Sequence, residues 1–144
     1  MHIDFIPISD ARYAGVLQLR QRVLREPLGL DLRLEDLSDE AHQVIGIVED
    51  VVGSVQACLL AKPLSGNTWK LRQMAVLPEC QGKGLGRQLM LAMEEMALHE
   101  GVHTITLHAR ATAIPFYEKL GYVCDGDVFL EVGIPHNFMR KTLV

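Results

Sequence analysis

A short glycine-rich segment at residues 78–87 joins an apolar run to a long amphipathic pattern. The segment reads Pro-Glu-Cys-Gln-Gly-Lys-Gly-Leu-Gly-Arg; the run before it is typical of a strand, and the apolar residues after it recur at helical spacing. Where a strand passes into a helix through glycines, free backbone N–H groups add to the positive end of the helix dipole. The segment therefore predicts an anion site, suited to a phosphate, at the junction of strand and helix.

Length and composition limit the class of protein. The 144 residues are 49% hydrophobic and 22% charged, which is typical of a single globular domain over residues 1–144. The formal net charge of −4 argues against a nucleic-acid partner, because phosphate backbones are bound mainly by clustered Lys and Arg. Polar residues interrupt the start of the chain, and no run approaches the ~18 apolar residues of a membrane span. We therefore expect a soluble, cytoplasmic protein with no membrane partner.

Hydrophobic periodicity orders the chain into strands and helices. Strands are predicted over residues 2–8, 42–49, 52–61, 68–77, 102–109, 122–124 and 138–143. Helices are predicted from a cap at Ser9 or Asp10 to Pro27–Gly29, from Leu85 to a stop at Gly101, and over residues 113–120. The acidic segment 30–41 is interpreted as a partly helical loop. Short turns within residues 42–77 predict an antiparallel meander, and the mixture of elements places the chain in the α/β (α+β) class.

Glycine loops that bind phosphate differ in their spacing. A Walker A loop needs G-x-x-x-x-G-K-[ST], but here Gly84 follows Lys83 and no upstream glycine fits. A dinucleotide loop needs G-x-G-x-x-G, whereas this chain has glycines at 82, 84 and 86. Residues 81–86 instead fit the pattern Q/R-x-x-G-x-G/A. The spacing thus argues against the first two loops and favours the third.

A second motif lies downstream at residues 113–122, with the sequence Ala-Ile-Pro-Phe-Tyr-Glu-Lys-Leu-Gly-Tyr. It is similar to A-x-x-F-Y-x-K-x-G-F/Y, and the two motifs in this order resemble those of the GNAT acetyltransferase superfamily. Residues 129–136 resemble the F-x-E-x-G-I-P-H element of the ElaA/YjcF-like branch, and residues 19–24 resemble its L-R-x-x-V-F element. One departure is Arg110, which stands where the superfamily often has Asn.

The resemblance implies a GNAT fold, in which a mixed, mostly antiparallel sheet is flanked by helices and splayed at the cofactor site. It also implies acetyl-CoA as co-substrate, with its pyrophosphate on the N–H groups of residues 82–87 and its pantetheine arm beside residues 74–76. The implied cofactor-binding residues are Met74, Ala75, Val76, Gln81, Gly82, Lys83, Gly84, Leu85, Gly86, Arg87, Phe116 and Tyr117.

Two of these residues have implied catalytic roles. Tyr117 is the expected general acid, because a phenol with a pKa of ~10 stays protonated at neutral pH. The backbone N–H of Met74 is the expected hydrogen-bond donor to the thioester carbonyl. The structural alternatives are that Tyr117 only packs its helix on the core, and that the glycine loop is a helix entry without a ligand.

The predicted reaction is direct transfer of an acetyl group to a primary amine of a small molecule in a ternary complex. Two alternatives stay open: transfer to a protein or peptide amine, and a non-catalytic CoA-binding sensor module. The general base is not evident, because the strand before the loop contains no carboxylate. A water chain, His108 and His136 are the candidates.

The cysteines do not predict a further site. Cys58, Cys80 and Cys124 are odd in number and lack CxxC spacing, so neither a disulfide framework nor a zinc site is indicated. Cys80 lies close to the glycine loop, but no base stands at a readable spacing from it. We expect free thiols and no metal.

Charged residues leave the acceptor side open. The acidic run 35–40 is either a solvated face or a surface for a cationic acceptor. Arg20, Arg22 and Arg110 either contact an acidic group of the substrate or make surface ion pairs. The expected partners are therefore acetyl-CoA and an amine, and a homodimer is an open option.

Overall fold

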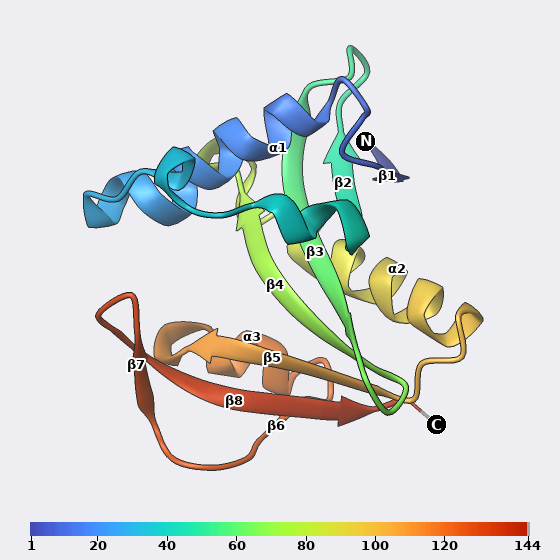
Figure 1. Cartoon of the computed structure of the whole chain (residues 1–144), viewed down its shortest axis with the longest axis vertical. Coiled ribbons are helices and arrows are strands. Elements are labelled where there is room, and N and C mark those ends of the chain that lie inside the picture. The colour runs from blue at the N-terminus through green and yellow to red at the C-terminus, as the bar shows by residue number, and fades with distance from the viewer. Residues whose placement is uncertain (144) are drawn as a thin grey trace.

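An eight-stranded sheet organises the described part of the chain, residues 1–143, in the computed structural model (Figure 1). The strands are β1 (His2–Ile6), β2 (Val44–Glu49), β3 (Val55–Leu64), β4 (Thr68–Val76), β5 (Thr104–Arg110), β6 (Val123–Cys124), β7 (Phe129–Glu131) and β8 (Ile134–Thr142). Their order is β1-β2-β3-β4-β5-β8-β6, with β7 also paired to β8. Only β4 and β5 pair in parallel within this part of the chain, which confirms the predicted mixed, mostly antiparallel sheet.

Helices cover both faces of the sheet. The α-helices are α1 (Tyr13–Arg20), α2 (Leu85–His99) and α3 (Ile114–Glu118). α1 continues through a π-helical turn, Gln21–Arg25, and further 3-10 turns lie at Glu26–Leu28, Leu32–Leu34, Ser38–His42, Pro78–Cys80 and Ala111–Ala113. Figure 1 shows α1 on one face of the sheet and α2 on the other. Within residues 1–143, no helix combines the length and the apolar character needed to cross a membrane.

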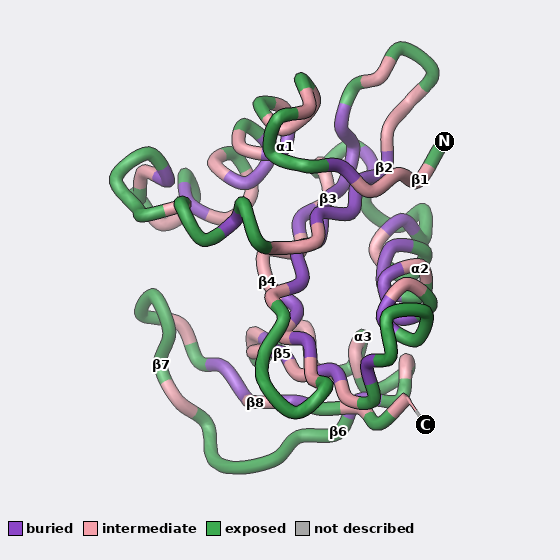
Figure 2. The backbone as a smooth tube through the Cα atoms, turned by 45° about the vertical axis from the view of Figure 1, so that its right-hand side comes forward, coloured by how far each residue is buried: buried purple, intermediate pink, exposed green. Residues whose placement is uncertain are grey.

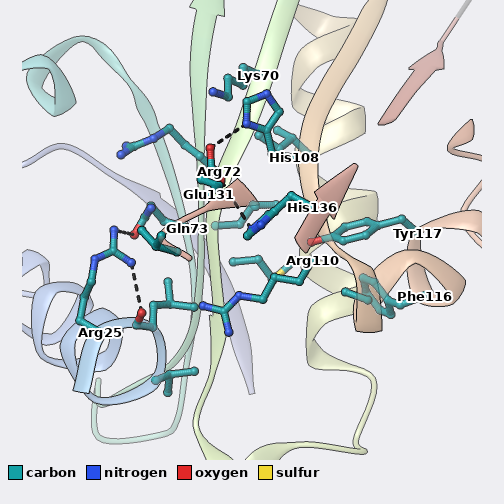
Figure 3. A pocket seen from close by; sticks show the side chains of 17 residues that line it. Arg25, Lys70, Arg72, Gln73, His108, Arg110, Phe116, Tyr117, Glu131 and His136 are labelled. Atoms are coloured by element: carbon teal, nitrogen blue, oxygen red, sulfur yellow. Dashed lines mark hydrogen bonds and ion pairs between the residues drawn. The ribbon is translucent and has the colours of Figure 1, made fainter. Parts of the chain in front are cut away.

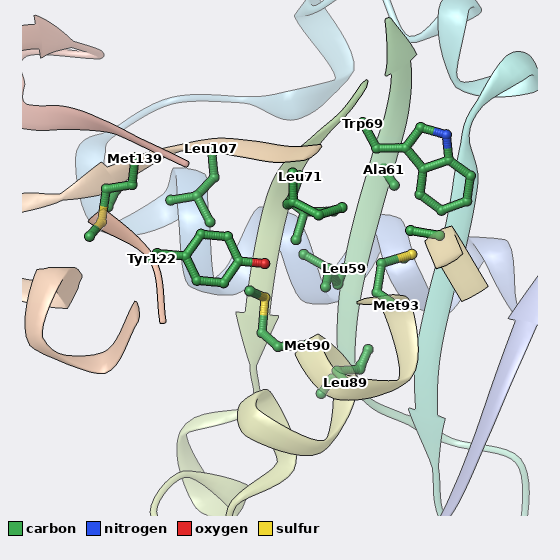
Figure 4. Packing of buried hydrophobic residues seen from close by; sticks show 14 of the residues in the cluster. Leu59, Ala61, Trp69, Leu71, Leu89, Met90, Met93, Leu107, Tyr122 and Met139 are labelled. Carbon is green, nitrogen blue, oxygen red and sulfur yellow. The ribbon is translucent and has the colours of Figure 1, made fainter. Parts of the chain in front are cut away.

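The side chains of β3 alternate between two hydrophobic cores. Ala57, Leu59 and Ala61 pack on the side of α2, whereas Cys58 and Leu60 pack on the side of α1. Figure 2 shows β3 as a buried strand in the middle of the molecule, and Figure 4 shows methionines of α2 closing the first core. A strand covered on both faces needs a continuous apolar run, which is what the sequence of β3 supplies.

A β-bulge in β4 reverses the direction in which its side chains face. The residues of β4 that pair with β3 step from Arg72 to Ala75 where β3 advances from Leu60 to Cys58. Gln73 within this step has a φ of 59°, which is left-handed backbone and rare for a residue with a side chain. Past the bulge the alternation is shifted by one residue, so the side chain of Ala75 packs on the α1 side.

The bulge lies where the sheet opens. β4 and β5 pair only over Thr68–Leu71 and Thr104–Leu107, and beyond these residues the two strands diverge (Figure 1). A bulge bends and twists its strand, which gives a physical reason for the divergence. Gln73 and Met74 have no paired residue in β3. On the opposite edge of β4, the residues after Leu71 have no neighbouring strand in the described sheet. Backbone groups of β4 therefore face an open space between the strands.

A buried ion pair fixes the acidic segment beside the bulge. Arg20 and Glu40 have side chains exposed by 0% and 2%, and two hydrogen bonds of 2.7 and 2.8 Å join them. Arg20 Nε also donates to Gln73 Oε1 at 3.2 Å. Both readings of Arg20 from the sequence were therefore wrong, because the guanidinium is neither at the surface nor open to a substrate. Likewise Glu40 is not part of a solvated acidic face.

The predicted elements match the structure with a few differences. The first helix begins at Tyr13, and Asp10 accepts a hydrogen bond from the N–H of Arg12 in the preceding turn rather than capping the helix itself. The helical segment ends at Gly29, with a φ of 70°, as the sequence predicts. β7 was not predicted, and β8 begins earlier than expected, because the exposed hairpin between them carries no clear apolar alternation.

Candidate active site

A cavity of about 530 Å³ occupies the space between the diverging strands (Figure 3). Residues of β4 and β5 form its walls, α3 and the hairpin of β7 and β8 close two sides, and the end of the first helical segment closes a third. This volume lies in the range of small-molecule sites, which is roughly 300 to 1,000 Å³. The cavity therefore suits a small substrate, and its walls come from segments far apart in the sequence.

The glycine loop forms the entry to α2 and has the geometry of an anion site. Gly82 and Gly84 both have a φ of 78°, and a Cβ at either position would meet no atom within 4 Å. Gly84 directly precedes α2, while Leu85 is 5% exposed and anchors the helix start in the core. Lys83 and Arg87 are exposed beside the loop. The loop thus combines left-handed glycines, a helix N-terminus and two cations, which is a set that fits a pyrophosphate.

Gln81 differs from the other loop residues because its N–H groups are used within the protein. Its backbone N–H donates to the carbonyl of Pro78 at 3.3 Å, and its side-chain amide donates to the carbonyl of Val76 at 3.2 Å. These bonds close the turn between β4 and α2. Gln81 therefore shapes the loop, whereas the N–H groups that can face an anion follow it.

Two side chains connect this loop with the cavity. A Cβ at Gly86, in the first turn of α2, would lie 3.5 Å from Phe116 Cζ and 3.9 Å from Met74 Sδ. Phe116 and Met74 both line the cavity. The structure therefore brings these three predicted residues together, along a path from the loop to the space between the strands.

The remaining strand residues contribute through their backbone. Ala75 is 2% exposed and pairs with Cys58, and the side chain of Val76 packs against the core on the side of α2. Because no strand of the described sheet lies on the other edge of β4 here, its N–H and C=O groups can pair with an extended ligand as another strand would. The resemblance assigns this edge of β4 to a pantetheine arm.

Tyr117 lies on α3 with its ring against other aromatic side chains. Its ring contacts Phe116 and Tyr122 edge to face, with centroid distances of 5.0 and 6.0 Å. Pro115 in the first turn favours the helix at this point, since its ring presets the backbone angle. Burial raises the pKa of Tyr117 to about 12, so the hydroxyl is protonated at neutral pH. The side chain of Tyr117 lines the cavity (Figure 3).

A carboxylate that the sequence analysis did not single out lies between the two candidate histidines. Glu131 Oε1 is 2.9 Å from His108 Nδ1, and its Oε2 is 3.6 Å from His136 Nε2. His136 is buried, and its Nδ1 lies 2.8 Å from the carbonyl oxygen of Ile134. Although burial opposes it, hydrogen bonding to His108 lowers the pKa of Glu131. All three side chains line the cavity.

The sequence signal for Glu131 and His136 lies in the motif at residues 129–136. Glu131 and His136 are the two residues with ionisable side chains in the segment Phe-Leu-Glu-Val-Gly-Ile-Pro-His, which carries the resemblance to the branch. The turn at Val132 and Gly133, with φ values of 48° and 75°, folds β7 back on β8 and brings both residues toward β5. The register then sets Phe129 opposite His136, and β8 pairs with β5.

A separate cluster near the N-terminus contains side chains of the metal-binding type. His2, Asp4 and Glu49 approach one another, but the guanidinium of Arg12 already lies 2.9 Å from both carboxylates. The cluster lies outside the lining of the cavity.

The splayed sheet, the phosphate-type loop and the cavity with its acid and base candidates define an acyltransferase. A sequence profile described as Acetyltransferase (GNAT) domain matches residues 35–143. The chain belongs to the GNAT acetyltransferase family and is an acetyl-CoA-dependent N-acetyltransferase.

Individual relatives agree with this assignment. A Bacillus subtilis protein named as an acetyltransferase is 37% identical over 139 residues, which is 92% of this chain and 91% of that protein. The uncharacterised N-acetyltransferase YjcF of the same organism is 36% identical over 88 residues, which is 56% of this chain and 63%, less than two thirds, of YjcF. A Lactobacillus plantarum protein named as an N-acetyltransferase is 27% identical in sequence. Its crystal structure superposes on this chain with a TM-score of 0.89, and the match covers 100% of both chains.

Proposed function

We propose that this acetyltransferase acts on the primary amine of a small molecule by direct attack in a ternary complex. The observation that supports this most strongly is the cavity of about 530 Å³ at the opening of the sheet, which is shared by Met74, Tyr117 and His108. One space thus contains a strand backbone, a protonated phenol and an imidazole. Acetyl-CoA supplies the acetyl group and the thiol that leaves.

The loop residues hold the phosphates of the donor. The N–H groups of residues 82–87 face the pyrophosphate, and Lys83 and Arg87 add positive charge beside it. Met74 and Phe116 flank the path from this loop to the cavity, so the acetyl end reaches the opening of the sheet. The chain's residues thereby fix the position of the reacting carbonyl relative to β4.

Two groups of the protein stabilise the transfer. The N–H of Met74 donates to the carbonyl oxygen as the amine nitrogen forms its bond to the carbonyl carbon, and such donors contribute ~3 kcal/mol in other enzymes. Tyr117 gives its proton to the sulfur as the C–S bond breaks, because its raised pKa keeps the hydroxyl protonated until then. Solvent afterwards returns a proton to Tyr117. No covalent bond to the enzyme forms in this scheme.

His108 takes the proton that the amine loses. With a proton on Nδ1, His108 donates to Glu131 at 2.9 Å and leaves Nε2 free to accept. Glu131 holds this tautomer and stabilises the imidazolium, while His136 faces the second oxygen of Glu131. A carboxylate that orients a histidine base in this way is a known arrangement in acyl transfer. The pair of His108 and Glu131 thus fills the role of general base, for which β4 offers no carboxylate.

The test is an acceptor screen that measures free CoA thiol and identifies the acetylated product by mass spectrometry. The panel contains small primary amines and a peptide with a free N-terminus and a lysine. We expect turnover of a small amine. When the concentrations of both substrates are varied, the double-reciprocal plots of the initial rate should give intersecting lines. Turnover of the peptide alone would contradict the small-molecule assignment, and parallel lines would contradict direct transfer.

Gly84→Glu provides the blank, because it adds a strained Cβ and a negative charge at the loop. Gly101→Glu is the matched control, since Gly101 also has a φ of 78° and an open Cβ position but lies at the other end of α2. We expect Gly84→Glu to lose both the turnover and the acetyl-CoA thermal shift, and Gly101→Glu to keep both. Equal behaviour of the two variants would refute the assigned pyrophosphate site.

A further inference from the structure

The charges that line the cavity are not balanced. Arg25, Lys70, Arg72 and Arg110 contribute four cationic side chains to the lining, and Glu131 contributes the one carboxylate. A binding site for a substrate that carries only ammonium groups would need the opposite sign. The excess of positive charge thus indicates a ligand with negative charge.

Two of the four cations have carboxylate partners from outside the lining. Arg25 Nε lies 2.6 Å from Glu35 Oε2, and Arg72 Nη1 lies 3.1 Å from Glu40 Oε2. These two ion pairs hold residues 30–41 against the sheet. Both guanidinium groups therefore have a carboxylate partner before any ligand binds, and Arg72 shares the single charge of Glu40 with Arg20.

The other two cations have no such partner. Within residues 1–143, neither Lys70 nor Arg110 makes a hydrogen bond through its side chain or an ion pair, although both residues are half-buried. Burial lowers the pKa of Lys70, partly offset by the charge of Glu131. Glu131 itself is bonded to His108. A half-buried cation without a partner is partly desolvated at a cost, and an anion in the cavity would offset this cost.

Arg110 stands close to the assigned base. His108 and Arg110 are two positions apart on β5, so both side chains lie on the same face of the strand, with Cα atoms about 7 Å apart. Figure 3 shows Arg110 extending into the cavity, with Tyr117 and His108 around the same space. Because both side chains line the same cavity, one molecule can present an amine to His108 and an anionic group to Arg110.

The donor does not supply this anion. The acetyl group and the thioester are uncharged, and the phosphates are assigned to residues 82–87, which do not line the cavity. The cations also disfavour an ammonium ion nearby and so favour the neutral, nucleophilic amine. An anionic group on the acceptor fulfils both conditions, since it holds the molecule while the amine stays uncharged.

We propose that the acceptor is a small amine that also carries a carboxylate or phosphate, and that Arg110, assisted by Lys70, binds this anionic group. The inference rests on the proposed function and specifies its substrate class. A planar guanidinium matches either anion with two parallel hydrogen bonds, so Arg110 is the main determinant.

The test uses matched pairs of short aliphatic amines. β-Alanine is compared with its methyl ester, and O-phosphoethanolamine with ethanolamine; 1,3-diaminopropane represents a second cation. We expect at least one anionic amine to exceed its uncharged partner about tenfold or more in kcat/KM, the size of a charge-assisted hydrogen bond. The ester has the more acidic ammonium and thus more neutral amine, so a preference for the acid cannot come from amine reactivity. The two pairs separate carboxylate from phosphate.

Variants of Arg110 locate the effect. Arg110→Gln is expected to raise KM for the preferred anionic amine about tenfold or more, and to leave its uncharged partner and acetyl-CoA within about twofold. Arg110→Lys keeps the positive charge but loses the planar guanidinium that makes two parallel hydrogen bonds. Its KM for the anionic amine is expected to lie between those of the wild type and Arg110→Gln. Arg33→Gln, in a side chain that is 90% exposed and paired with Asp31, removes the same charge elsewhere and is the control.

Several outcomes would overturn the inference. Equal or better use of the uncharged partner in both pairs would do so, as would an acceptor found in the wider screen that has no anionic group. An equal loss for charged and uncharged amines in Arg110→Gln, or a raised KM for acetyl-CoA, would assign Arg110 to the donor instead. If acetyl-CoA binds but no amine is acetylated, the proposed function fails first, and the inference fails with it.

Discussion

The buried pair of Arg20 and Glu40 allows a quantitative prediction of stability. The two side chains are exposed by 0% and 2%, so neither charge has solvent as an alternative partner. Glu40→Gln keeps the shape of the side chain but removes its charge, which leaves the guanidinium of Arg20 buried without an anion. Breaking a buried pair from one side costs about 3 to 5 kcal/mol. We expect the free energy of unfolding to fall by this amount, a large share of the roughly 5 to 15 kcal/mol of a typical domain.

Urea unfolding at neutral pH measures this loss, and thermal unfolding should show a decrease in Tm of roughly 10 to 15 °C. Asp39→Asn is the matched control, since it makes the same chemical change one residue away in a side chain that is 53% exposed, and it should cost less than about 1 kcal/mol. The double variant Arg20→Met/Glu40→Leu should recover part of the loss, because the buried guanidinium is removed together with its carboxylate, while Tyr13 and Arg72 lose their bonds to Glu40. A cost of Glu40→Gln that equals that of the control would refute the reasoning.

The pH dependence of this difference follows from the same pair. Burial alone would raise the pKa of Glu40, but hydrogen bonds from Arg20, Tyr13 and Arg72 lower it below its ordinary value. Because the pKa in the folded state is the lower one, the stabilisation is present above the unfolded value of ~4.3 and is lost as the pH falls through the folded value. The gap between wild type and Glu40→Gln should therefore shrink under acidic conditions. A gap that is constant with pH would contradict this account.

Further predictions concern catalysis. Tyr117→Phe should lower kcat about 10²- to 10⁴-fold at saturating acetyl-CoA, and full turnover would exclude the acid role. Since the pKa of Tyr117 is raised to about 12, wild-type kcat should show no alkaline decline from this group between about pH 8 and 10; a decline abolished by Tyr117→Phe would contradict this. Glu131→Gln should lower kcat and change its pH profile, whereas Asp127→Asn in the exposed segment before β7 should not; an unchanged profile would limit Glu131 to a structural role. Phe116→Ala should raise KM for acetyl-CoA more than it changes kcat, and the opposite pattern would separate Phe116 from the donor path.

Local parts of the site could be predicted from the sequence because their geometry depends on residues close together in the chain. Gly82 and Gly84 adopt the left-handed backbone of the loop, and Tyr117 follows Pro115 in a short helix, as their motifs indicate. The alternation and turns of residues 42–77 likewise predicted the meander. Each of these features requires only neighbours within a few residues.

Other parts of the site depend on pairing across the sheet. Glu131 meets His108 because β7 folds back on β8, and β8 pairs with β5, so the contact spans segments without any local signal. Gln73 adopts a left-handed backbone although it is not a glycine, so no residue preference in the sequence predicts the bulge at this point.

By itself, the sequence determined the donor side of the protein: the glycine loop, the following helix and the tyrosine motif, in which the necessary backbone angles and residue types are local. Only the tertiary structure decided the acceptor side. Which arginines are neutralised and which stay free depends on carboxylates brought from distant segments, as Arg20 is paired with Glu40 while Arg110 has no such partner in residues 1–143. The physical reason is that the availability of a charge depends on burial and on neighbours in space, and neither is written in the spacing of residues along the chain.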